Sequence, residues 1–318
     1  MRGRVISEHS MIQRYFAPLA HACPGARGLR DDAACLTPPP GYQVVITTDG
    51  NIGGIHFPLN APPAVMAHRS LAVNLSDLAA MGAKPWVYSL SLSAPKTFFQ
   101  EQTLAPFCRT LLGLQKRYDI ALSGGDTTVY DGPPHIHVTA LGVVPMRSAL
   151  HREGAKAGDD LYVSGRIGDA GHGLSLWQQG VRGNDAGLNR YLYPAPRIDL
   201  GLALRGLATA CMDISDGFVG DLQHICQASG VTAHVDVDAI PLNPHIPWDQ
   251  ALRCGDDYEL LFTAPPQHRE RIHALGQSLN LSLTRVGYST DVCMIHGCVV
   301  LKRGGSEVKI SNPSFCHF

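Results

Sequence analysis

Apolar and polar positions along this chain change repeatedly between helical and strand-like spacing. An apolar stripe at helical spacing predicts an amphipathic helix near the start of the chain. The segment that opens at Pro62-Pro63 has the same spacing and predicts a second helix. Residues 135–144 instead alternate as a strand does, with His135, His137 and Thr139 on one face. The apolar stripe of the first helix consists of Met11, Ile12, Tyr15, Phe16 and Leu19.

Strands and helices interleave in both halves of the chain, so each half is predicted to be α/β or α+β. The pattern breaks between 149 and 158, where Gly154 and Gly158 lie close together, and we place a domain boundary there, giving domains 1–150 and 151–318. The further predicted strands are 42–47, 86–92, 121–123, 161–164, 231–237, 258–263 and 297–301. The further predicted helices are 104–118, 168–178, 199–208, 217–228 and 267–279.

Composition narrows the class of protein. Hydrophobic residues make up 45% of the 318 residues and charged residues 17%, which is enough for a packed core and too apolar for disorder. The formal net charge of −1 gives no reason to expect a nucleic-acid or membrane partner. Neither a secretory segment nor an apolar run long enough to span a membrane is visible.

The nine cysteines are scattered and include no C-x-x-C pair. This spacing favours buried free thiols in a reducing compartment over a disulfide framework or a zinc site. We therefore expect a cytoplasmic protein.

Aspartate recurs beside glycine or a hydroxyl residue, at what the pattern predicts to be strand ends. Mg²⁺ prefers hard oxygen ligands and keeps water and phosphate oxygens in its shell, which short carboxylates and hydroxyls suit. Glycine in such a turn lets a backbone N–H approach a phosphate. The segments are Asp31–Ala34, Thr47–Gly50, Asn74–Asp77, Gly124–Thr128, Asp213–Gly217 and Gly255–Glu259.

Aspartate is also common in turns and at helix N-caps, and Asp213 or Asp216 could simply cap the helix that follows Gly217. Asp131 and the pair Asp159-Asp160 are interpreted as plain turn residues without chemistry. Six such segments together favour metal ligands over turn residues. Two like charges ~4 Å apart cost ~4 kcal/mol at an effective dielectric constant near 20, so clustered carboxylates predict bound divalent metal.

Other nucleotide and hydrolase motifs are missing from the sequence. There is no G-x-x-x-x-G-K-[ST] loop, no H-R-D or D-F-G set, no H-E-x-x-H and no G-x-S-x-G. The glycine-rich run 165–173 does not fit the dinucleotide fingerprint and is interpreted as structural, with weak phosphate proximity as the lesser option.

The order of the acidic motifs resembles that of the thiamine-monophosphate kinase family, in the AIR-synthase-like superfamily. The matching motifs are D-D-A-A, T-T-D, G-x-H-F, N-L-S-D-L-A-A-M-G-A-x-P, G-G-D-T-T, D-I-S-D-G and G-D-D-Y-E-L, between about Ser7 and Thr263. The resemblance implies a two-domain α/β fold, with an N-terminal domain that forms a β-barrel across a homodimer.

The resemblance also implies ATP-dependent phosphorylation of thiamine monophosphate to thiamine diphosphate, by direct in-line transfer assisted by Mg²⁺. Carried over by position, the implied metal ligands are Asp32, Thr47, Thr48, Asp49, Asp77, Asp126, Asp213 and Asp216. Of these, the implied catalytic residues are Asp126, Asp49 and Asp213. The implied ATP contacts are Gly125, Arg152 and Ser215. The implied thiamine contacts are His56 and Asp256.

Arg152 is alternatively a solvated surface residue, and His56 alternatively a histidine satisfied beside Phe57. Two departures from the family pattern lie beside the acidic motifs: Arg30 precedes the paired aspartates and Gly50 follows Asp49. The C-terminal tail also lacks the tryptophan that some relatives carry, and Phe315 is its candidate replacement.

Two alternatives stay open, and Arg30 and Gly50 are the features that keep the second of them open. One is another ATP-using enzyme of the superfamily, such as AIR synthase, selenophosphate synthetase or the hydrogenase-maturation dehydratase. The other is a non-catalytic relative that binds nucleotide and metal.

Overall fold

The computed structural model describes residues 8–291 and 299–310, which form two compact units. The first unit comprises Met1–Leu78 and Lys84–Met146, and the second comprises Ala79–Ala83 and Arg147–Phe318. Residues 79–83 therefore belong with the second half of the chain. Phe315 lies outside the described residues.

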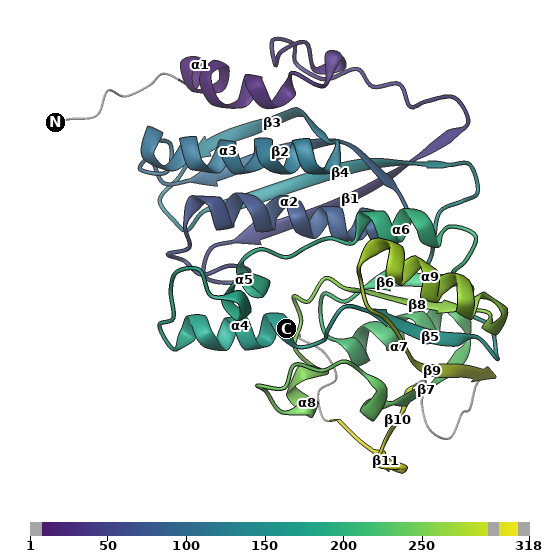
Figure 1. The fold of residues 1–318 in the computed structure, drawn as a ribbon. Coiled ribbons are helices and arrows are strands. Elements are labelled where there is room, and N and C mark those ends of the chain that lie inside the picture. Colours follow the sequence, from purple (N-terminus) through teal and green to yellow (C-terminus); the bar gives the residue numbers. More distant parts are fainter. Residues whose placement is uncertain (1–7, 292–298, 311–318) are drawn as a thin grey trace. The chain divides into compact units, whose positions relative to one another are not determined.

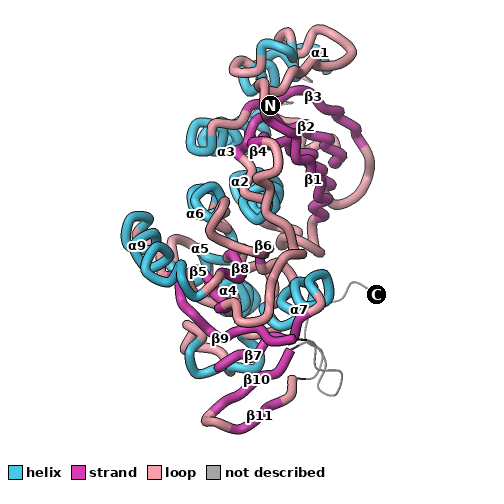
Figure 2. The backbone as a smooth tube through the Cα atoms, turned by 90° about the vertical axis from the view of Figure 1, so that its right-hand side faces the viewer, coloured by secondary structure: helices cyan, strands magenta, loops and turns pink. Residues whose placement is uncertain are grey.

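The first unit is built on a four-stranded sheet of order β1-β4-β2-β3, in which only β2 and β3 run parallel (Figure 1). Helices α2 and α3 cover one face of this sheet, as Figure 2 shows from the side. The elements are α1 (Glu8–Met11), β1 (Tyr42–Ile52), α2 (Pro63–Ala80), β2 (Lys84–Ala94), α3 (Glu101–Tyr118), β3 (Ala121–Val129) and β4 (His135–Pro145).

Alternation along β1 places one set of side chains against the helices and the other set on the open face. Thr47, Asp49 and Asn51 pair across the sheet with Ala140, Val138 and Ile136, which are all fully buried. Tyr42, Val44 and Ile46 belong to the opposite face and are 41%, 41% and 66% exposed.

The second unit contains a seven-stranded sheet of order β11-β10-β7-β9-β5-β8-β6, with α7 on one face and α9 on the other (Figure 2). Its strands are β5 (Asp160–Ser164), β6 (Ala210–Asp213), β7 (Val231–Asp236), β8 (Leu260–Ala264), β9 (Leu283–Asp291), β10 (Val299–Arg303) and β11 (Ser306–Val308). Its helices are α4 (Asp169–Gln178), α5 (Ala186–Leu192), α6 (Ile198–Leu204), α7 (Phe218–Ser229), α8 (Trp248–Ala251) and α9 (Arg269–Leu279).

The predicted α/β class is confirmed, but two strands near acidic motifs have different bounds from those predicted. β3 does not end at Gly124-Gly125, because pairing with β2 continues to Val129. β8 begins at Leu260 rather than at Tyr258, because Tyr258 has a φ of 50°, which an extended strand does not allow. The predicted position of aspartates at strand ends is thus wrong for Asp49 and Asp126, which lie inside β1 and β3.

All six cysteines of the described residues are free thiols. Cys23, Cys108, Cys211 and Cys226 are buried, as the spacing predicted. Burial raises the pKa of the Cys108 thiol to about 12, so this group is an unreactive core residue.

Two helical glycines make opposite predictions for stability. A Cβ at Gly173 of α4 would lie 2.6 Å from both the carbonyl oxygen of Gly187 and the Cβ of Tyr191, whereas a Cβ at Gly113 of α3 meets nothing. Gly173→Ala is expected to lower the free energy of unfolding by about 1–3 kcal/mol, because it pushes α5 away from α4. Gly113→Ala is expected to raise it by about 0.5–1 kcal/mol through helix propensity. Urea unfolding measures both, and a stabilised Gly173→Ala variant would contradict the close packing.

Candidate functional site

The first acidic group lies where β1 meets α2. The Thr47 hydroxyl donates a hydrogen bond to the Asp77 carboxylate, and the Asp49 side chain shares a further hydrogen bond with Asp77. Burial, followed by the negative charge of Asp77, raises the pKa of Asp49 to about 7. These hard oxygen donors suit a divalent cation, whose charge would offset the repulsion between the two carboxylates.

The Thr48 hydroxyl belongs to the opposite face of β1. Its Oγ1 lies 3.0 Å from Oγ1 of Thr139 and 3.2 Å from the carbonyl oxygen of Val138. The structure therefore separates the Thr48 hydroxyl from the Asp49–Asp77 pair.

The second acidic group lines a cavity of about 180 Å³ beside β3. Asp31 and Asp32 reach this cavity from the loop before β1, and Gly125 and Asp126 reach it from β3. Asp126 Oδ2 accepts a hydrogen bond of 3.1 Å from the Thr128 hydroxyl. A Cβ at position 125 would lie 1.9 Å from the Leu90 carbonyl oxygen, so only glycine fits there.

The two groups lie at different edges of the four-stranded sheet. One row of paired residues runs from Asp49 through Val138 and Leu90 to Gly125, crossing all four strands. Three strand spacings correspond to about 14 Å. Among the residues that the structure describes, no three His, Cys, Asp or Glu side chains are placed to hold one metal ion. The first unit thus presents two separate groups of carboxylates, Asp49 with Asp77 and Asp126 with Asp31 and Asp32, rather than one cluster.

Of the two departures near these motifs, Gly50 has a structural explanation and Arg30 has none. Gly50 pairs with His137 of β4, and a Cβ at Gly50 would lie 2.6 Å from the imidazole Cε1, so the His137 ring occupies that space. Arg30 is exposed, and the ion pair in its loop joins Arg27 to Asp31 at 3.4 Å.

In the second unit, the Asp213–Gly217 segment connects β6 to α7. Asp213 is 4% exposed, whereas Asp216 is exposed. Neither side chain caps α7, because the N-cap residue is Gly217 and no side chain bonds there as a cap. The alternative that Asp213 or Asp216 is an N-cap is therefore wrong.

Asp221, in the first turn of α7, holds this segment. Its Oδ2 accepts hydrogen bonds of 3.1 Å from the backbone N–H groups of Ser215, Asp216 and Gly217. Burial raises the pKa of Asp221 to about 7, although the three donors act in the opposite direction. Asp221 was not among the residues predicted from the sequence, where its only signal is an acidic residue in the first turn after D-I-S-D-G.

The Gly255–Glu259 segment packs against the same loop. The Asp256 N–H donates to the Ser215 carbonyl oxygen at 2.8 Å, and the Tyr258 N–H donates to that of Ile214 at 2.9 Å. A Cβ at Gly255 would lie 2.2 Å from the Ser215 carbonyl oxygen, so glycine permits this contact.

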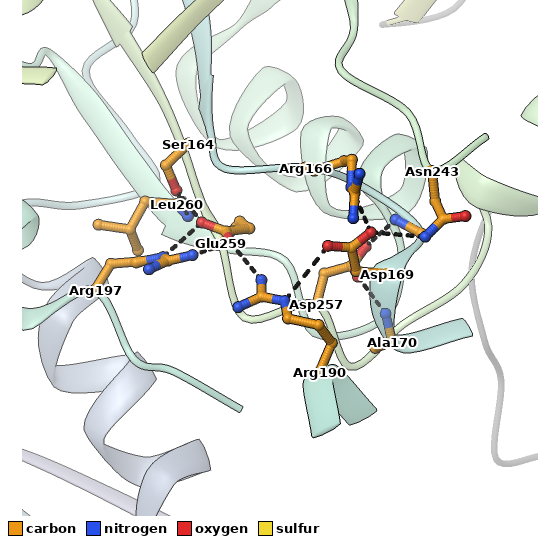
Figure 3. A network of polar contacts seen from close by, with 11 residues as sticks. Ser164, Arg166, Asp169, Ala170, Arg190, Arg197, Asn243, Asp257, Glu259 and Leu260 are labelled. Carbon is orange, nitrogen blue, oxygen red and sulfur yellow. Dashed lines mark hydrogen bonds and ion pairs between the residues drawn. The ribbon is translucent and has the colours of Figure 1, made fainter. Parts of the chain in front are cut away.

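Figure 3 shows how two buried carboxylates anchor the segment. Glu259, fully buried, binds the guanidinium groups of Arg190 and Arg197 and accepts a bond of 2.6 Å from the Ser164 hydroxyl. Asp257 accepts the N–H groups of Gly168 and Ala170 at 2.7 and 3.0 Å.

Burial, with the added charges of Glu259 and Asp169, raises the pKa of Asp257 to about 8. Two N–H groups at the start of α4, those of Gly168 and Ala170, are therefore occupied by protein. This supports the structural interpretation of the glycine-rich run 165–173.

His56, Arg152 and Asp160 are further residues singled out from the sequence. His56 Nδ1 accepts the Ile52 N–H at 3.1 Å, so the neutral ring carries its proton on Nε2. The Arg152 side chain is exposed, and its backbone carbonyl accepts the Ser229 hydroxyl at 3.1 Å. Asp160, interpreted from sequence as a turn residue, lies inside β5 and pairs with Arg269 at 2.6 Å.

Known proteins match the chain over nearly its whole length. The model of the AIR synthase related protein N-terminal domain matches residues 30–144, and that of the C-terminal domain matches residues 156–296. The thiamine-monophosphate kinase of Salmonella typhimurium is 41% identical over 98% of each chain. The chain belongs to the thiamine-monophosphate kinase family.

Solved structures of this family share the fold. The thiamine-monophosphate kinase from Stenotrophomonas maltophilia K279a has a TM-score of 0.80 at 42% identity, covering 88% of this chain and 91% of that chain. AaThiL, solved in complex with AMPPCP and TMP, has a TM-score of 0.76 at 28% identity, covering 91% of each chain. As a member of the family the chain is a phosphotransferase. None of the helices in the described part of the chain is long and apolar enough to cross a membrane.

The raised pKa of Asp49 beside Asp77 predicts that the stability of the protein depends on pH. The pKa of Asp49 is about 7 in the folded state against an ordinary 3.8, so between about pH 4 and pH 7 only the unfolded chain loses this proton. Asp49 therefore lowers the free energy of unfolding progressively as the pH rises through that interval. Asp77→Asn removes one cause of the raised pKa and is expected to reduce the loss.

Melting temperatures of wild type and Asp77→Asn, measured from pH 4 to pH 8 without metal, test this prediction. Asp131→Asn, at an exposed turn, is the charge-matched control. Parallel pH profiles for wild type and Asp77→Asn would contradict it.

Proposed function

We propose that this chain phosphorylates thiamine monophosphate with ATP to give thiamine diphosphate. The observation that carries this proposal is the match to thiamine-monophosphate kinases across 98% of the chain at up to 41% identity. The complex of AaThiL with AMPPCP and TMP supports both substrates, since AMPPCP is an analogue of ATP.

The residues present fit Mg²⁺, because the acidic positions offer carboxylate and hydroxyl oxygens and few softer ligands. The residues proposed to hold Mg²⁺ are Asp32, Thr47, Thr48, Asp49, Asp77, Asp126, Asp213 and Asp216, of which Thr48 turns its hydroxyl away from the Asp49–Asp77 pair. Mg²⁺, when bound, would neutralise charge on the phosphates of ATP. Since no three acidic side chains of the described residues are placed to hold one metal ion, phosphate oxygens would have to complete the coordination.

The chain's own contribution is to position the reactants. Gly125 lets the backbone of β3 approach a phosphate, while Arg152 and Ser215 bind the nucleotide. His56 and Asp256 contact the thiamine side of the acceptor. The acceptor phosphate is already ionised near pH 7, so direct in-line transfer needs no strong general base and no covalent enzyme intermediate.

A turnover assay tests this function. With ATP and Mg²⁺, ADP release that depends on thiamine monophosphate is the expected result. ADP release with a different acceptor would favour another ATP-using enzyme of the superfamily. Nucleotide binding without turnover would favour a non-catalytic relative.

Asp126→Asn is expected to abolish transfer and to leave the fold unchanged or slightly more stable, because it removes a negative charge from the cavity that Asp32 also lines. ADP release and melting temperature measure the two effects. Asp131→Asn is the control and is expected to retain activity. A large fall in melting temperature with retained activity would make Asp126 a structural residue.

The open face of the β1–β4 sheet pairs two copies of the chain into a homodimer. Three alternate residues of the edge strand β1 carry exposed apolar side chains, namely Tyr42, Val44 and Ile46. A contiguous apolar surface on an edge strand is costly in water, and pairing with a second sheet covers it.

Ile46→Asp, which places a charge in the middle of this surface, is expected to convert the dimer into a monomer. Light scattering coupled to size-exclusion chromatography measures the molecular mass. Leu59→Asp is the matched control, because Leu59 is 61% exposed in a loop outside the strand. A monomeric wild type, or a dimeric Ile46→Asp variant, would contradict the proposed interface.

A further inference from the structure

Side chains of the Gly255–Glu259 segment divide into an anchored set, Asp257 and Glu259, and a hydrogen-bonded pair, Asp256 and Tyr258. Asp257 and Glu259 are 4% and 0% exposed and bind the start of α4 and the arginines of Figure 3. Asp256 and Tyr258 instead bind each other, because the Tyr258 hydroxyl donates a hydrogen bond of 3.0 Å to Asp256 Oδ1.

The backbone of this hydrogen-bonded pair has an unusual conformation. Asp256 and Tyr258 have φ values of 69° and 50°, in the left-handed region that non-glycine residues rarely adopt. Asparagine and aspartate tolerate this region, but tyrosine does not favour it. Such residues persist only where the surroundings enforce them, and they occur preferentially at functional sites.

Contacts on both sides of the segment enforce this conformation. The N–H groups of Asp256 and Tyr258 bind the carbonyl oxygens of Ser215 and Ile214, and the Ile214 N–H donates to the Glu259 carbonyl oxygen at 2.8 Å. Together with the buried anchors, these bonds fix where the Tyr258 ring lies. The ring is 8% exposed, so its hydroxyl cannot move away from Asp256 without disturbing the packing.

We propose that Tyr258 is a positioning residue, whose hydroxyl fixes the Asp256 carboxylate in the orientation that contacts the thiamine side of the acceptor. This inference rests on the proposed function, in which Asp256 contacts that substrate. One carboxylate oxygen of Asp256 accepts the tyrosine hydroxyl, and this bond sets the orientation of the carboxylate. Tyr258 acts only through Asp256 and does not touch the reacting phosphates.

Steady-state kinetics of the full chain with ATP, Mg²⁺ and thiamine monophosphate test the proposal. Tyr258→Phe keeps the buried ring and removes only the hydroxyl. It is expected to raise the KM for thiamine monophosphate about five- to tenfold, the effect of losing a hydrogen bond to a charged group. The KM for ATP and kcat are expected to stay within about twofold of wild type, since the hydroxyl acts on acceptor binding alone.

Three further variants distinguish positioning of Asp256 from a general loosening of the segment. Tyr162→Phe is the matched control, because Tyr162 is a buried tyrosine of the same unit that bonds Arg269 away from this segment, and its KM values are expected to match wild type. Asp256→Asn is expected to raise the KM for thiamine monophosphate. The double variant Asp256→Asn/Tyr258→Phe is expected to lose nothing more, because the hydroxyl then has no carboxylate to orient.

Each outcome decides the proposal. An unchanged KM for thiamine monophosphate in Tyr258→Phe, or an equal rise in both KM values, overturns it. Should Tyr258→Phe not fold, Asp256→Asn decides, because a wild-type KM there means that no substrate-binding carboxylate exists to be positioned. A wild type that turns over ATP with no thiamine monophosphate dependence overturns the proposed function itself, which a change confined to Tyr258→Phe cannot do.

Discussion

Buried carboxylates that accept backbone N–H groups are the interaction on which the candidate site of the second unit depends. Asp221 binds three successive N–H groups of the loop before α7, and Asp257 binds two at the start of α4. A loop with unpaired buried N–H groups would be unstable, because each such group loses its bond to water on burial. These two aspartates satisfy the donors and so fix the loops that carry Ser215 and Asp256.

Burial of a carboxylate costs free energy, and the buried carboxylates of this protein offset that cost in different ways. Glu259 has two arginines beside it, so its charge is compensated inside the protein. Asp257 and Asp221 have only N–H donors, and burial raises their pKa values to about 8 and about 7. Asp49 faces another carboxylate, and its pKa rises to about 7. Of these groups, the Asp49–Asp77 pair would gain most from an added cation, which favours this pair over the anchors as part of the proposed metal site.

Sequence patterns were sufficient for the fold class and for most helices and strands, because apolar periodicity follows directly from burial of one face. They failed for strands whose position depends on contacts with distant parts of the sequence. β9 was missed because its pattern is broken by Gly287, whose missing Cβ allows the His234 carbonyl oxygen to approach to within 2.1 Å of that position. β3 was cut short because Gly124-Gly125 resembles a turn, although strand pairing with β2 carries it through.

The acidic motifs show a similar limit at the level of single residues. G-D-D-Y-E contains a hydrogen-bonded pair, Asp256 and Tyr258, and two buried anchors, Asp257 and Glu259. Sequence spacing cannot separate these roles, because the assignment depends on two left-handed residues that local sequence does not predict. A motif of this kind combines residues suited to ligand contact with residues that hold the backbone in place. Loss of activity on substituting any one of them therefore does not by itself identify a ligand contact, and a comparison of KM with kcat for each substrate is needed to distinguish the two roles.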